Sequence, residues 1–184
     1  MPSCVEVRSL ACVHGKRTTL RDVDLVLARG HVHGVLGPRW AGKSTLLRVL
    51  AGELTASSGS VQVPASVLLV GDDGRSPIEE RLDPPTRRRV ALARAVAGGP
   101  DLLLVDEPVE GFDAETTAAT RSLVLRYAGQ GGTVIWASKR LDVFLDLAAG
   151  VTLLAEGRVR YAGSAEGLAT RALGGLIVPL RHAA

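Results

Sequence analysis

One short glycine-containing stretch constrains this chain more than any other feature of its sequence. Residues 37–45 fit the pattern G-x-x-x-x-G-K-[ST], in which the glycines let successive backbone N–H groups point inward at an anion. A predicted buried strand at 31–36 precedes the stretch and helical spacing at 44–50 follows it. The loop is therefore expected at a helix N-terminus, where the helix dipole favours phosphate. The pattern predicts that Lys43 reaches the outer phosphates and that the Ser44 hydroxyl holds Mg²⁺. The residues of this predicted phosphate-binding loop are Gly37, Pro38, Arg39, Trp40, Ala41, Gly42, Lys43, Ser44 and Thr45.

An acidic segment later in the chain supplies the chemistry that a phosphate loop alone lacks. The aliphatic run 102–105 leads into the acidic pair Asp106 and Glu107, and such a strand delivers its last carboxylate to the sheet edge beside the loop. Asp106 would then hold Mg²⁺ through water, together with Ser44. Glu107 would polarise an attacking water as a general base. The competing interpretation is that the acidic pair merely ends a strand at a polar turn.

Composition indicates a single domain with an aliphatic core. Of the 184 residues, 46% are hydrophobic but only 3% are aromatic, so Leu, Val and Ala must fill the interior. The net charge of +3 is mild, and no basic stripe is interleaved with aromatics, which argues against a nucleic-acid partner. We expect one domain over residues 1–174 and a C-terminal tail over residues 175–184.

Neither a cysteine-based metal centre nor a membrane segment is expected. Cys4 and Cys12 are the only cysteines and have no histidine cluster beside them, so two reduced thiols are preferred over a disulfide framework or a metal site. The N-terminus lacks a basic start followed by an apolar run. The longest charge-free stretch, 54–71, is rich in Ser and contains Gln62 and Pro64. We therefore expect a soluble intracellular chain without direct membrane insertion.

Hydrophobic periodicity predicts strands that alternate with helices, which favours an α/β fold with a mainly parallel sheet covered on both faces. Buried parallel strands are expected at 32–36, 67–70, 102–105 and 133–136, and helices at 45–50, 87–97, 114–127 and 141–148. Shorter segments resemble a small antiparallel sheet, at 5–8, 23–27 and 60–63. A terminal hairpin over 151–161 and a last helix, capped by Ser164 and running through Leu173, complete the expected order.

Several motifs together resemble the nucleotide-binding subunit of ABC (ATP-binding cassette) ATPases over nearly the whole chain. Residues 37–45 are similar to the Walker A loop of that family, and 102–108 to its Walker B strand with the catalytic glutamate. Residues 111–113 resemble the D-loop, 90–95 the helix after the family signature, and 157–163 the closing hairpin. The resemblance implies a P-loop NTPase core, with a mainly parallel sheet flanked by helices and a small N-terminal antiparallel β subdomain. It also implies ATP and Mg²⁺ as ligands.

The chain departs from the family pattern at the signature motif. The family has LSGGQ there, whose small residues and helix N-terminus contact the γ-phosphate of a partner subunit's nucleotide, whereas this chain reads LDPPT at 82–86. Two prolines remove N–H donors and the freedom of glycine, and Asp83 places negative charge where phosphate would come. We expect this signature to be inactive, and residues 87–89 to form a solvated or partner-facing start of the next helix.

The switch histidine and the glutamine loop of the family are also altered. Lys139 stands where the histidine is expected, and it either contacts the γ-phosphate or is an ordinary exposed lysine. No glutamine follows the strand at 67–70; Asp72 or Asp73 either takes its water-mediated Mg²⁺ role or belongs to an acidic turn. The interval before Leu82 has room for one short helix at most, at 78–81, so the helical subdomain of the family is largely missing and the usual coupling to a permease is in doubt.

Two aromatic positions differ from the family as well. Trp40 replaces a small glycine in the loop, where a bulky indole would either crowd the phosphate nest or cover the nucleotide. The position of the aromatic side chain that stacks on adenine holds His14, before Gly15. Its imidazole either stacks on the purine or is a surface histidine in a turn.

These features favour an ATP-binding subunit of an ABC-type transporter, which binds Mg-ATP and hydrolyses it weakly or only with a partner ATPase. Because the signature is expected to be inactive, a heterodimer with a fuller ABC ATPase, working with an integral-membrane permease, is preferred over a symmetric homodimer. This places the chain in the cytoplasm, peripheral at the inner face of the cell membrane. The alternative is a non-hydrolysing regulatory or scaffold subunit of the same fold. A small-molecule P-loop kinase is disfavoured, because the chain offers no lid with paired arginines.

Overall fold

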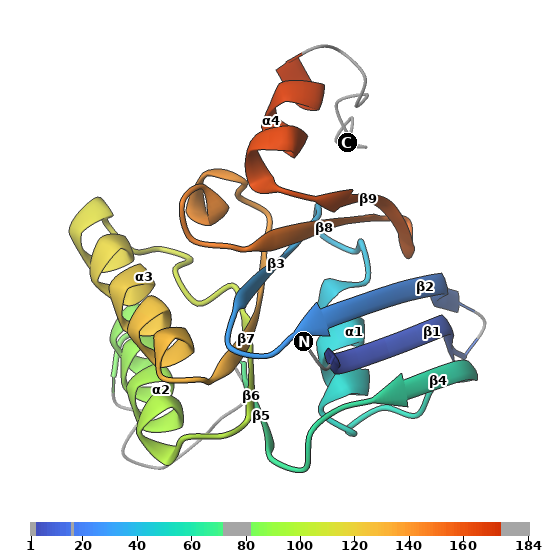
Figure 1. Cartoon of the computed structure of the whole chain (residues 1–184), viewed down its shortest axis with the longest axis horizontal. Helices are drawn as coiled ribbons and strands as arrows, with labels where there is room; N and C mark the ends of the chain where they lie inside the picture. Colours follow the sequence, from blue (N-terminus) through green and yellow to red (C-terminus); the bar gives the residue numbers. More distant parts are fainter. Residues whose placement is uncertain (1–2, 16, 72–81, 174–184) are drawn as a thin grey trace.

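A six-stranded, mostly parallel sheet lies at the centre of the computed structural model, which describes residues 3–15, 17–71 and 82–173 (Figure 1). Its strand order is β5-β6-β7-β3-β8-β9, and each pairing described in it is parallel except that of β8 with β9. The predicted strands and the closing hairpin are thus confirmed. The strands are β3 (Val32–Leu36), β5 (Val67–Val70), β6 (Leu102–Asp106), β7 (Thr133–Ser138), β8 (Gly150–Ala155) and β9 (Arg158–Gly163).

A second, antiparallel sheet of three strands in the order β2-β1-β4 confirms the predicted small β subdomain. Its first two strands are longer than the alternating segments in the sequence, because the β1–β2 pairing contains several register shifts that interrupt the period of two. One of these shifts lies between Val7 and Leu10, where Ser9 has a φ of 46°. The strands are β1 (Ser3–His14), β2 (Arg17–Ala28) and β4 (Ser58–Gln62).

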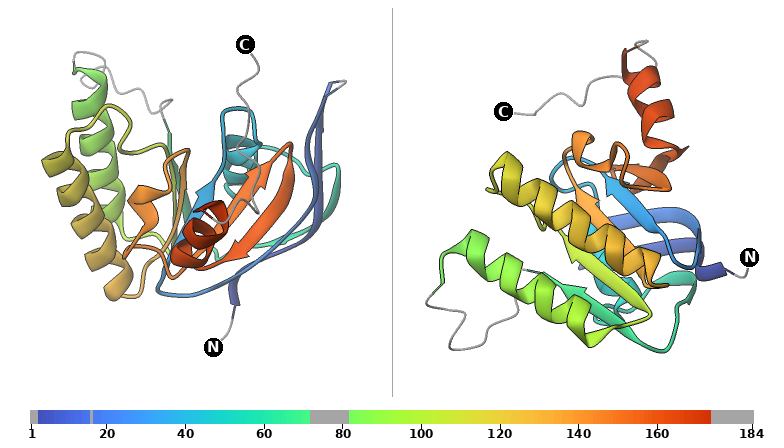
Figure 2. Two further views of the ribbon diagram at one scale, coloured as in Figure 1. Left: turned by 90° about the horizontal axis from the view of Figure 1, so that it is seen from above. Right: turned by 60° about the vertical axis from the view of Figure 1, so that its left-hand side comes forward.

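Helices cover both faces of the central sheet (Figure 2). On one face lie α2 (Pro84–Gly98) and α3 (Ala114–Gly129), and on the other lies α1 (Lys43–Leu50), between the central sheet and the antiparallel sheet. The last helix, α4 (Ala165–Leu173), follows β9, and the backbone N–H of Gly167 donates to Ser164 Oγ at 3.0 Å. That hydrogen bond is the expected N-terminal cap.

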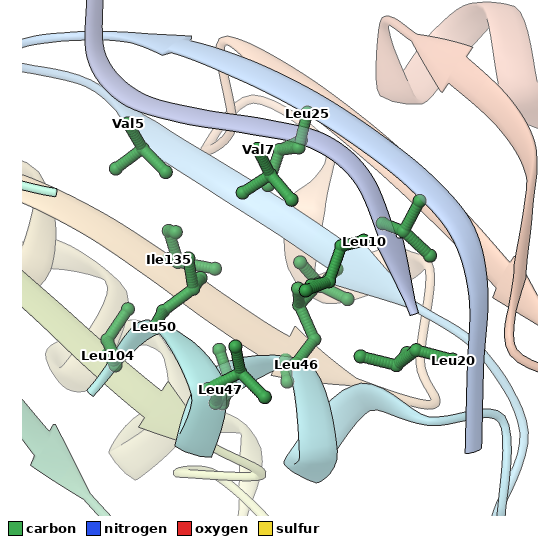
Figure 3. Close-up of a cluster of buried hydrophobic side chains, with 14 of the residues drawn as sticks. Val5, Val7, Leu10, Leu20, Leu25, Leu46, Leu47, Leu50, Leu104 and Ile135 are labelled. Atoms are coloured by element: carbon green, nitrogen blue, oxygen red, sulfur yellow. The ribbon is translucent and has the colours of Figure 1, made fainter. Parts of the chain in front are cut away.

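Two apolar clusters hold these layers together, because successive side chains of a strand point to opposite faces of its sheet. On β6, Leu102 and Leu104 belong to the cluster that includes α1 and the antiparallel sheet, whereas Leu103 and Val105 belong to the cluster under α2 and α3. Figure 3 shows the first cluster, in which leucines of α1 lie between valines and leucines of β1 and β2 and the side chains of β6 and β7. The helix α1 follows the phosphate loop, and its leucine-bearing face is therefore fully buried.

One predicted helix is wrong. The segment 141–148 forms only a short 3₁₀ turn, η2 (Asp142–Phe144), followed by Leu145 in an extended conformation and Asp146 at a φ of 59°. Phe144 and Leu147 are buried against the second cluster, so the apolar spacing that suggested a helix reflects burial of an irregular segment. The predicted short helix at 78–81 and the predicted tail at 175–184 lie outside the described residues.

The structure describes the state of the two cysteines and the character of the helices. Cys12 is buried, Cys4 is half-buried, and both are free thiols. Among the helices that the structure describes, none combines the length and apolar character needed to span a bilayer.

Removing a buried leucine from α1 tests whether this helix carries the first cluster. Leu46 is fully buried, so Leu46→Ala is expected to lower the free energy of unfolding by about 2–5 kcal/mol, through lost burial and an unfilled cavity. Urea unfolding followed by circular dichroism measures this change. The matched control is Leu125→Ala in α3, whose side chain is 44% exposed; equal losses in both variants would contradict the described packing.

Candidate functional site

The loop at 37–45 leaves the carboxyl end of β3 and enters the N-terminus of α1, as the sequence predicts. Gly42, directly before α1, has a φ of 104°, and a Cβ there would lie 2.7 Å from the carbonyl oxygen of Thr19. At Gly37, a Cβ would lie 2.4 Å from the carbonyl oxygen of Leu154. Both positions exclude a side chain, so the loop depends on its two glycines for this path.

Lys43 connects this loop to the end of β6. Its side chain is only 7% exposed, and the ammonium group donates to the carbonyl oxygens of Gly37 at 2.8 Å and Pro38 at 3.0 Å. The same Nζ lies 3.5 Å from Oε1 of Glu107. A buried ammonium group needs such partners to offset its lost hydration. The predicted phosphate-contacting cation and the predicted general base therefore face each other.

Glu107 is held in an unusual backbone conformation. It directly follows β6 with a φ of 45°, a left-handed geometry that costs a non-glycine residue about 1–3 kcal/mol and is typical of functional sites. Its backbone N–H donates to the carbonyl oxygen of Ala137 at 2.9 Å, and its Oε2 accepts a hydrogen bond from Ser138 Oγ at 3.0 Å. Ser138 Oγ in turn accepts from the backbone N–H of Arg140 at 3.1 Å. The carboxylate is thus fixed by β7 as well as by Lys43.

Burial raises the pKa of the Glu107 carboxyl, and the nearby Lys43 and the hydrogen bond from Ser138 offset only part of that rise. A carboxylate with a raised pKa is a better proton acceptor than a fully solvated one. Perturbed carboxyl groups in a cleft mark candidate functional sites. The electrostatics of Glu107 therefore suit the general-base role expected from the sequence.

A cavity of about 530 Å³ opens above the loop and brings together half of the predicted site residues, from the loop and from the end of β6. Arg39, Trp40, Lys43 and Ser44 line it from the loop and α1, and Asp106 and Glu107 line it from the end of β6, with Lys139 after β7. The cavity is also lined by two residues that the sequence did not assign to a site, Arg88 and Glu110. Four segments that are distant in the sequence thus form one pocket.

The structure describes the side chain of Trp40 but not that of His14, the other predicted aromatic ligand. His14 ends β1, but its side chain lies outside the described part of the structure, so its predicted stacking on adenine stays a prediction. Trp40 has a φ of 66° and is 86% exposed. Its indole therefore does not fill the phosphate nest. Asp72 and Asp73, the candidates for the missing glutamine, lie outside the described residues.

Glu110 and Arg88 were missed because the fold, not the local sequence, places them. The backbone N–H of Glu110 donates to the carbonyl oxygen of Glu107 at 3.1 Å, so a tight turn brings Glu110 back to the pocket. Its Oε1 accepts from Lys139 Nζ at 2.6 Å, and its carbonyl oxygen accepts from Arg88 Nη1 at 2.8 Å. Arg88 is half-buried, whereas the basic run 87–89 was expected to be solvated or to face a partner.

In the altered signature, a side chain of the chain itself caps the N-terminus of α2. Asp83 precedes α2, and its carboxylate accepts a hydrogen bond from the backbone N–H of Thr86 at 3.1 Å, with Pro84 and Pro85 in the first turn. Hydrogen bonds from Thr86 lower the pKa of Asp83. An internal carboxylate thus sits where an anion would otherwise meet the helix N-terminus. The inactivity of the signature stays a prediction.

The donors in the cavity suit magnesium bound together with phosphate. Among the described residues there is no cluster of three or more His, Cys, Asp or Glu side chains that would hold a metal by protein ligands alone. Mg²⁺ usually takes one or two protein oxygens and completes its shell with water and substrate phosphates. The Ser44 hydroxyl and the Asp106 carboxylate line the same cavity and are hard oxygen donors of this kind.

A second cavity, of about 600 Å³, lies away from the loop between β2, β3 and β8. His33 lines it and shares a 2.9 Å hydrogen bond with Thr152 Oγ1, and burial lowers the pKa of His33 to about 4. The imidazole is therefore neutral near pH 7. Among the described residues that line this cavity there is no lysine or arginine, so the first cavity is the better candidate for a nucleotide.

Comparison with known proteins agrees with the motifs and the fold. The model of the ABC transporter family matches residues 20–81. The cytochrome c biogenesis ATP-binding export protein CcmA of Sphingopyxis alaskensis is 28% identical over 167 residues, which span 70% of this chain and 86% of that protein. The aliphatic sulfonates import ATP-binding protein SsuB 2 of Burkholderia cenocepacia is 32% identical over 170 residues, spanning 67% of this chain and 63% of that protein.

Solved structures show the same fold. A nucleotide-free ATP-binding cassette from an ABC transporter superposes with a TM-score of 0.81 at 18% identity, covering 94% of this chain and 96% of that one. An ATP-binding cassette in its ADP conformation gives a TM-score of 0.81 at 18% identity, with 95% and 96% covered. The chain belongs to the ABC transporter family of ATP-binding proteins, as a nucleotide-binding subunit with an ABC ATPase fold.

The opposite pKa shifts of Glu107 and Glu110 predict opposite effects of pH on stability. Because the folded pKa of Glu107 is raised, ionising it costs the folded state stability as pH rises from the ordinary carboxyl range through the raised value. Glu107→Gln is therefore expected to unfold at a higher urea concentration than the wild type at pH 7–8, with no such advantage at pH 4.

Glu110→Gln is the matched comparison. The hydrogen bond from Lys139 lowers the pKa of Glu110, so its ionised form contributes stability above the ordinary carboxyl range, and this contribution is lost as pH falls through the lowered pKa. Because the pair with Lys139 is partly exposed, this variant is expected to unfold at only a slightly lower urea concentration than the wild type at pH 7–8. Shifts of the same sign in both variants at pH 7–8 would contradict the described electrostatics.

Proposed function

We propose that this subunit binds Mg-ATP in the cavity above the loop and hydrolyses it, weakly or only with a partner ATPase, to drive a membrane permease. The observation that carries the proposal is the 3.5 Å contact between Lys43 Nζ and Glu107 Oε1, which sets a phosphate-binding cation beside a candidate base. Both groups line the same cavity as Ser44 and Asp106.

In this proposal each residue of the chain has a distinct task. Lys43 and the backbone amides of the loop bind the outer phosphates, while Ser44 and Asp106 would hold the magnesium ion. Magnesium, when bound, neutralises charge on the transferring phosphoryl group. Glu107 orients and deprotonates the attacking water, and the hydrogen bond from Ser138 keeps its carboxylate aimed into the cavity.

The catalytic partner is proposed to be a second, fuller ABC ATPase. Positioning and charge stabilisation around the phosphoryl group supply most of the catalysis in such reactions. The first turn of α2 holds two prolines and the capping carboxylate of Asp83, which is unsuited to contact another subunit's phosphate. A heterodimer in which the partner supplies an intact signature is therefore proposed over a symmetric homodimer.

Coupling to a permease and the location of the chain rest on its relatives. The CcmA and SsuB 2 proteins are named as an export and an import ATP-binding protein, respectively. By analogy we propose a cytoplasmic subunit, peripheral at the inner face of the cell membrane through an integral-membrane permease, with one ATP-binding domain over residues 1–174. A regulatory or scaffold subunit that binds nucleotide without turnover is the alternative, and the aligned and strained Glu107 favours hydrolysis over it.

Two substitutions separate binding from hydrolysis. Lys43→Ala is expected to weaken Mg-ATP binding by at least about 10-fold, because a hydrogen bond between charged groups contributes about 1.5–3 kcal/mol. Glu107→Gln is expected to retain binding but to lower turnover by about 10²–10⁴-fold, the usual contribution of a general base. Isothermal titration calorimetry measures the first effect and phosphate release the second, both with and without the candidate partner ATPase.

Two results of these assays would count against the proposal. Unchanged affinity in Lys43→Ala would refute the nucleotide site, provided that circular dichroism shows both proteins folded. Equal phosphate release by the wild type and Glu107→Gln, with and without the partner, would replace the ATPase by the scaffold alternative.

The fluorescence of Trp40 can be used to detect nucleotide binding at the loop. The chain has two tryptophans: Trp136 is fully buried, whereas Trp40 is 86% exposed and lines the cavity. Mg-ATP is therefore expected to change the tryptophan fluorescence of the wild type, since the nucleotide alters the surroundings of Trp40. The change should disappear in Trp40→Phe and persist in Trp136→Phe; a signal that survives in Trp40→Phe would contradict nucleotide binding at this loop.

A further inference from the structure

The rim of the nucleotide cavity carries a negative side chain that the proposed mechanism does not use. Glu110 lines the cavity and is bound by Lys139 Nζ at 2.6 Å. Its backbone carbonyl is bound by Arg88 at 2.8 Å. Glu110 lies in the turn after β6, Lys139 directly after β7, and Arg88 in α2. We call Arg88, Glu110 and Lys139 the rim cluster.

The charges around the cavity show why Glu110 is notable. The lining includes the cations Arg39, Lys43, Arg88 and Lys139 and the carboxylates Asp106, Glu107 and Glu110. Asp106 and Glu107 have tasks in the proposed site, namely the metal and the attacking water. Glu110 has no such task, and it weakens the positive potential that a polyphosphate needs. Its pKa is lowered chiefly by the hydrogen bond from Lys139, with further contributions from Arg88 and Arg39.

The rim cluster lies where the end of a phosphate chain would arrive. Lys43 is expected to contact the outer phosphates and is 3.5 Å from Glu107. Glu110 lies one tight turn after Glu107 in the chain, because its backbone N–H donates to the carbonyl oxygen of Glu107 at 3.1 Å. A triphosphate that passes Lys43 and reaches Glu107 therefore ends next to Lys139, whereas a diphosphate is one phosphoryl group shorter.

We propose that Glu110 is an internal counter-anion that pairs with Lys139 until the terminal phosphate of a nucleoside triphosphate displaces it, so that the rim cluster distinguishes a triphosphate from a diphosphate. This inference rests on the proposed function, because it concerns the same cavity. It assigns Glu110 and Lys139 a role in specificity for the terminal phosphate.

The ion pair is suited to such an exchange. The side chains of Lys139 and Glu110 are 42% and 38% exposed, and exposed ion pairs contribute little net stability because water solvates both partners. A terminal phosphate carries more negative charge than a carboxylate and offers several acceptor oxygens, so the ammonium group of Lys139 gains by the exchange. The carbonyl contact from Arg88 holds the turn in place while the side chain of Glu110 moves away.

The experiment compares affinities for a triphosphate and a diphosphate. Isothermal titration calorimetry with Mg²⁺ is carried out with a non-hydrolysable ATP analogue and with ADP, on the wild type, Lys139→Gln and Glu110→Gln. The matched control is Arg140→Gln, the adjacent cation, whose guanidinium pairs with Asp142 and is not part of the cavity lining. The quantity compared is the ratio of the two dissociation constants, which a general loss of stability would not change.

Lys139→Gln is expected to lower the preference for the triphosphate by roughly 10-fold, through weaker binding of the analogue and little change for ADP. Glu110→Gln is expected to raise the preference, because the competing carboxylate is removed. Arg140→Gln is expected to retain the wild-type ratio. These three results together support the inference.

Two results would overturn it. If Lys139→Gln and Glu110→Gln bind both nucleotides with the wild-type ratio, the rim cluster is merely structural, while the proposed nucleotide site stands. If Glu110→Gln weakens binding of the analogue, Glu110 is a ligand rather than a competitor. A wild type that binds neither nucleotide would refute the proposed function itself, and the inference with it.

Discussion

The contact between Lys43 and Glu107 is the interaction on which the rest of the site depends. It joins a loop at the start of α1 to the end of β6, and it does so with a lysine that is almost fully buried. Such a buried charge is tolerated only because the loop carbonyls of Gly37 and Pro38 accept its hydrogen bonds. The same ammonium group lines the cavity and would be available to phosphate. Lys43 therefore stabilises the loop through its carbonyl oxygens and also places a positive charge in the pocket.

The layers of the fold fix the positions of Lys43 and Glu107 relative to each other. The neighbouring strands β6 and β7 end at one edge of the central sheet, where Asp106 and Ala137 are paired, and the next residues are Glu107 and Ser138. Parallel strands deliver their carboxyl ends to the same edge, which is where ligands bind in open α/β sheets. The leucines of α1 are packed against both sheets, so the first turn of that helix cannot drift away from the pocket.

The sequence predicted the parts of this site that are encoded locally. The glycines, Lys43 and Ser44 occupy fixed spacings in one loop, and the acidic pair follows an uninterrupted aliphatic strand, so each half was evident from its own segment. The rim cluster could not be found in this way, because sheet register and helix packing bring Arg88, Glu110 and Lys139 together.

The wrong helix at 141–148 has a different cause. Burial of Phe144 and Leu147 produces apolar spacing like that of a helix, yet Asp146 turns the chain through a left-handed conformation that ends any helix there. Hydrophobic periodicity indicates which side chains are buried, but it does not determine the backbone conformation that buries them. In contrast, the strands at 32–36 and 133–136 are mostly buried on both faces inside a parallel sheet, and there the apolar pattern and the backbone geometry agree.

The most direct test of the central claim is a crystal structure of the protein with Mg²⁺ and a non-hydrolysable ATP analogue. The account predicts that the Lys43 ammonium group exchanges a loop carbonyl for an outer phosphate oxygen at hydrogen-bond distance, with the metal between Ser44 and Asp106. A nucleotide bound elsewhere, with Lys43 still on the carbonyl oxygens of Gly37 and Pro38, would contradict it.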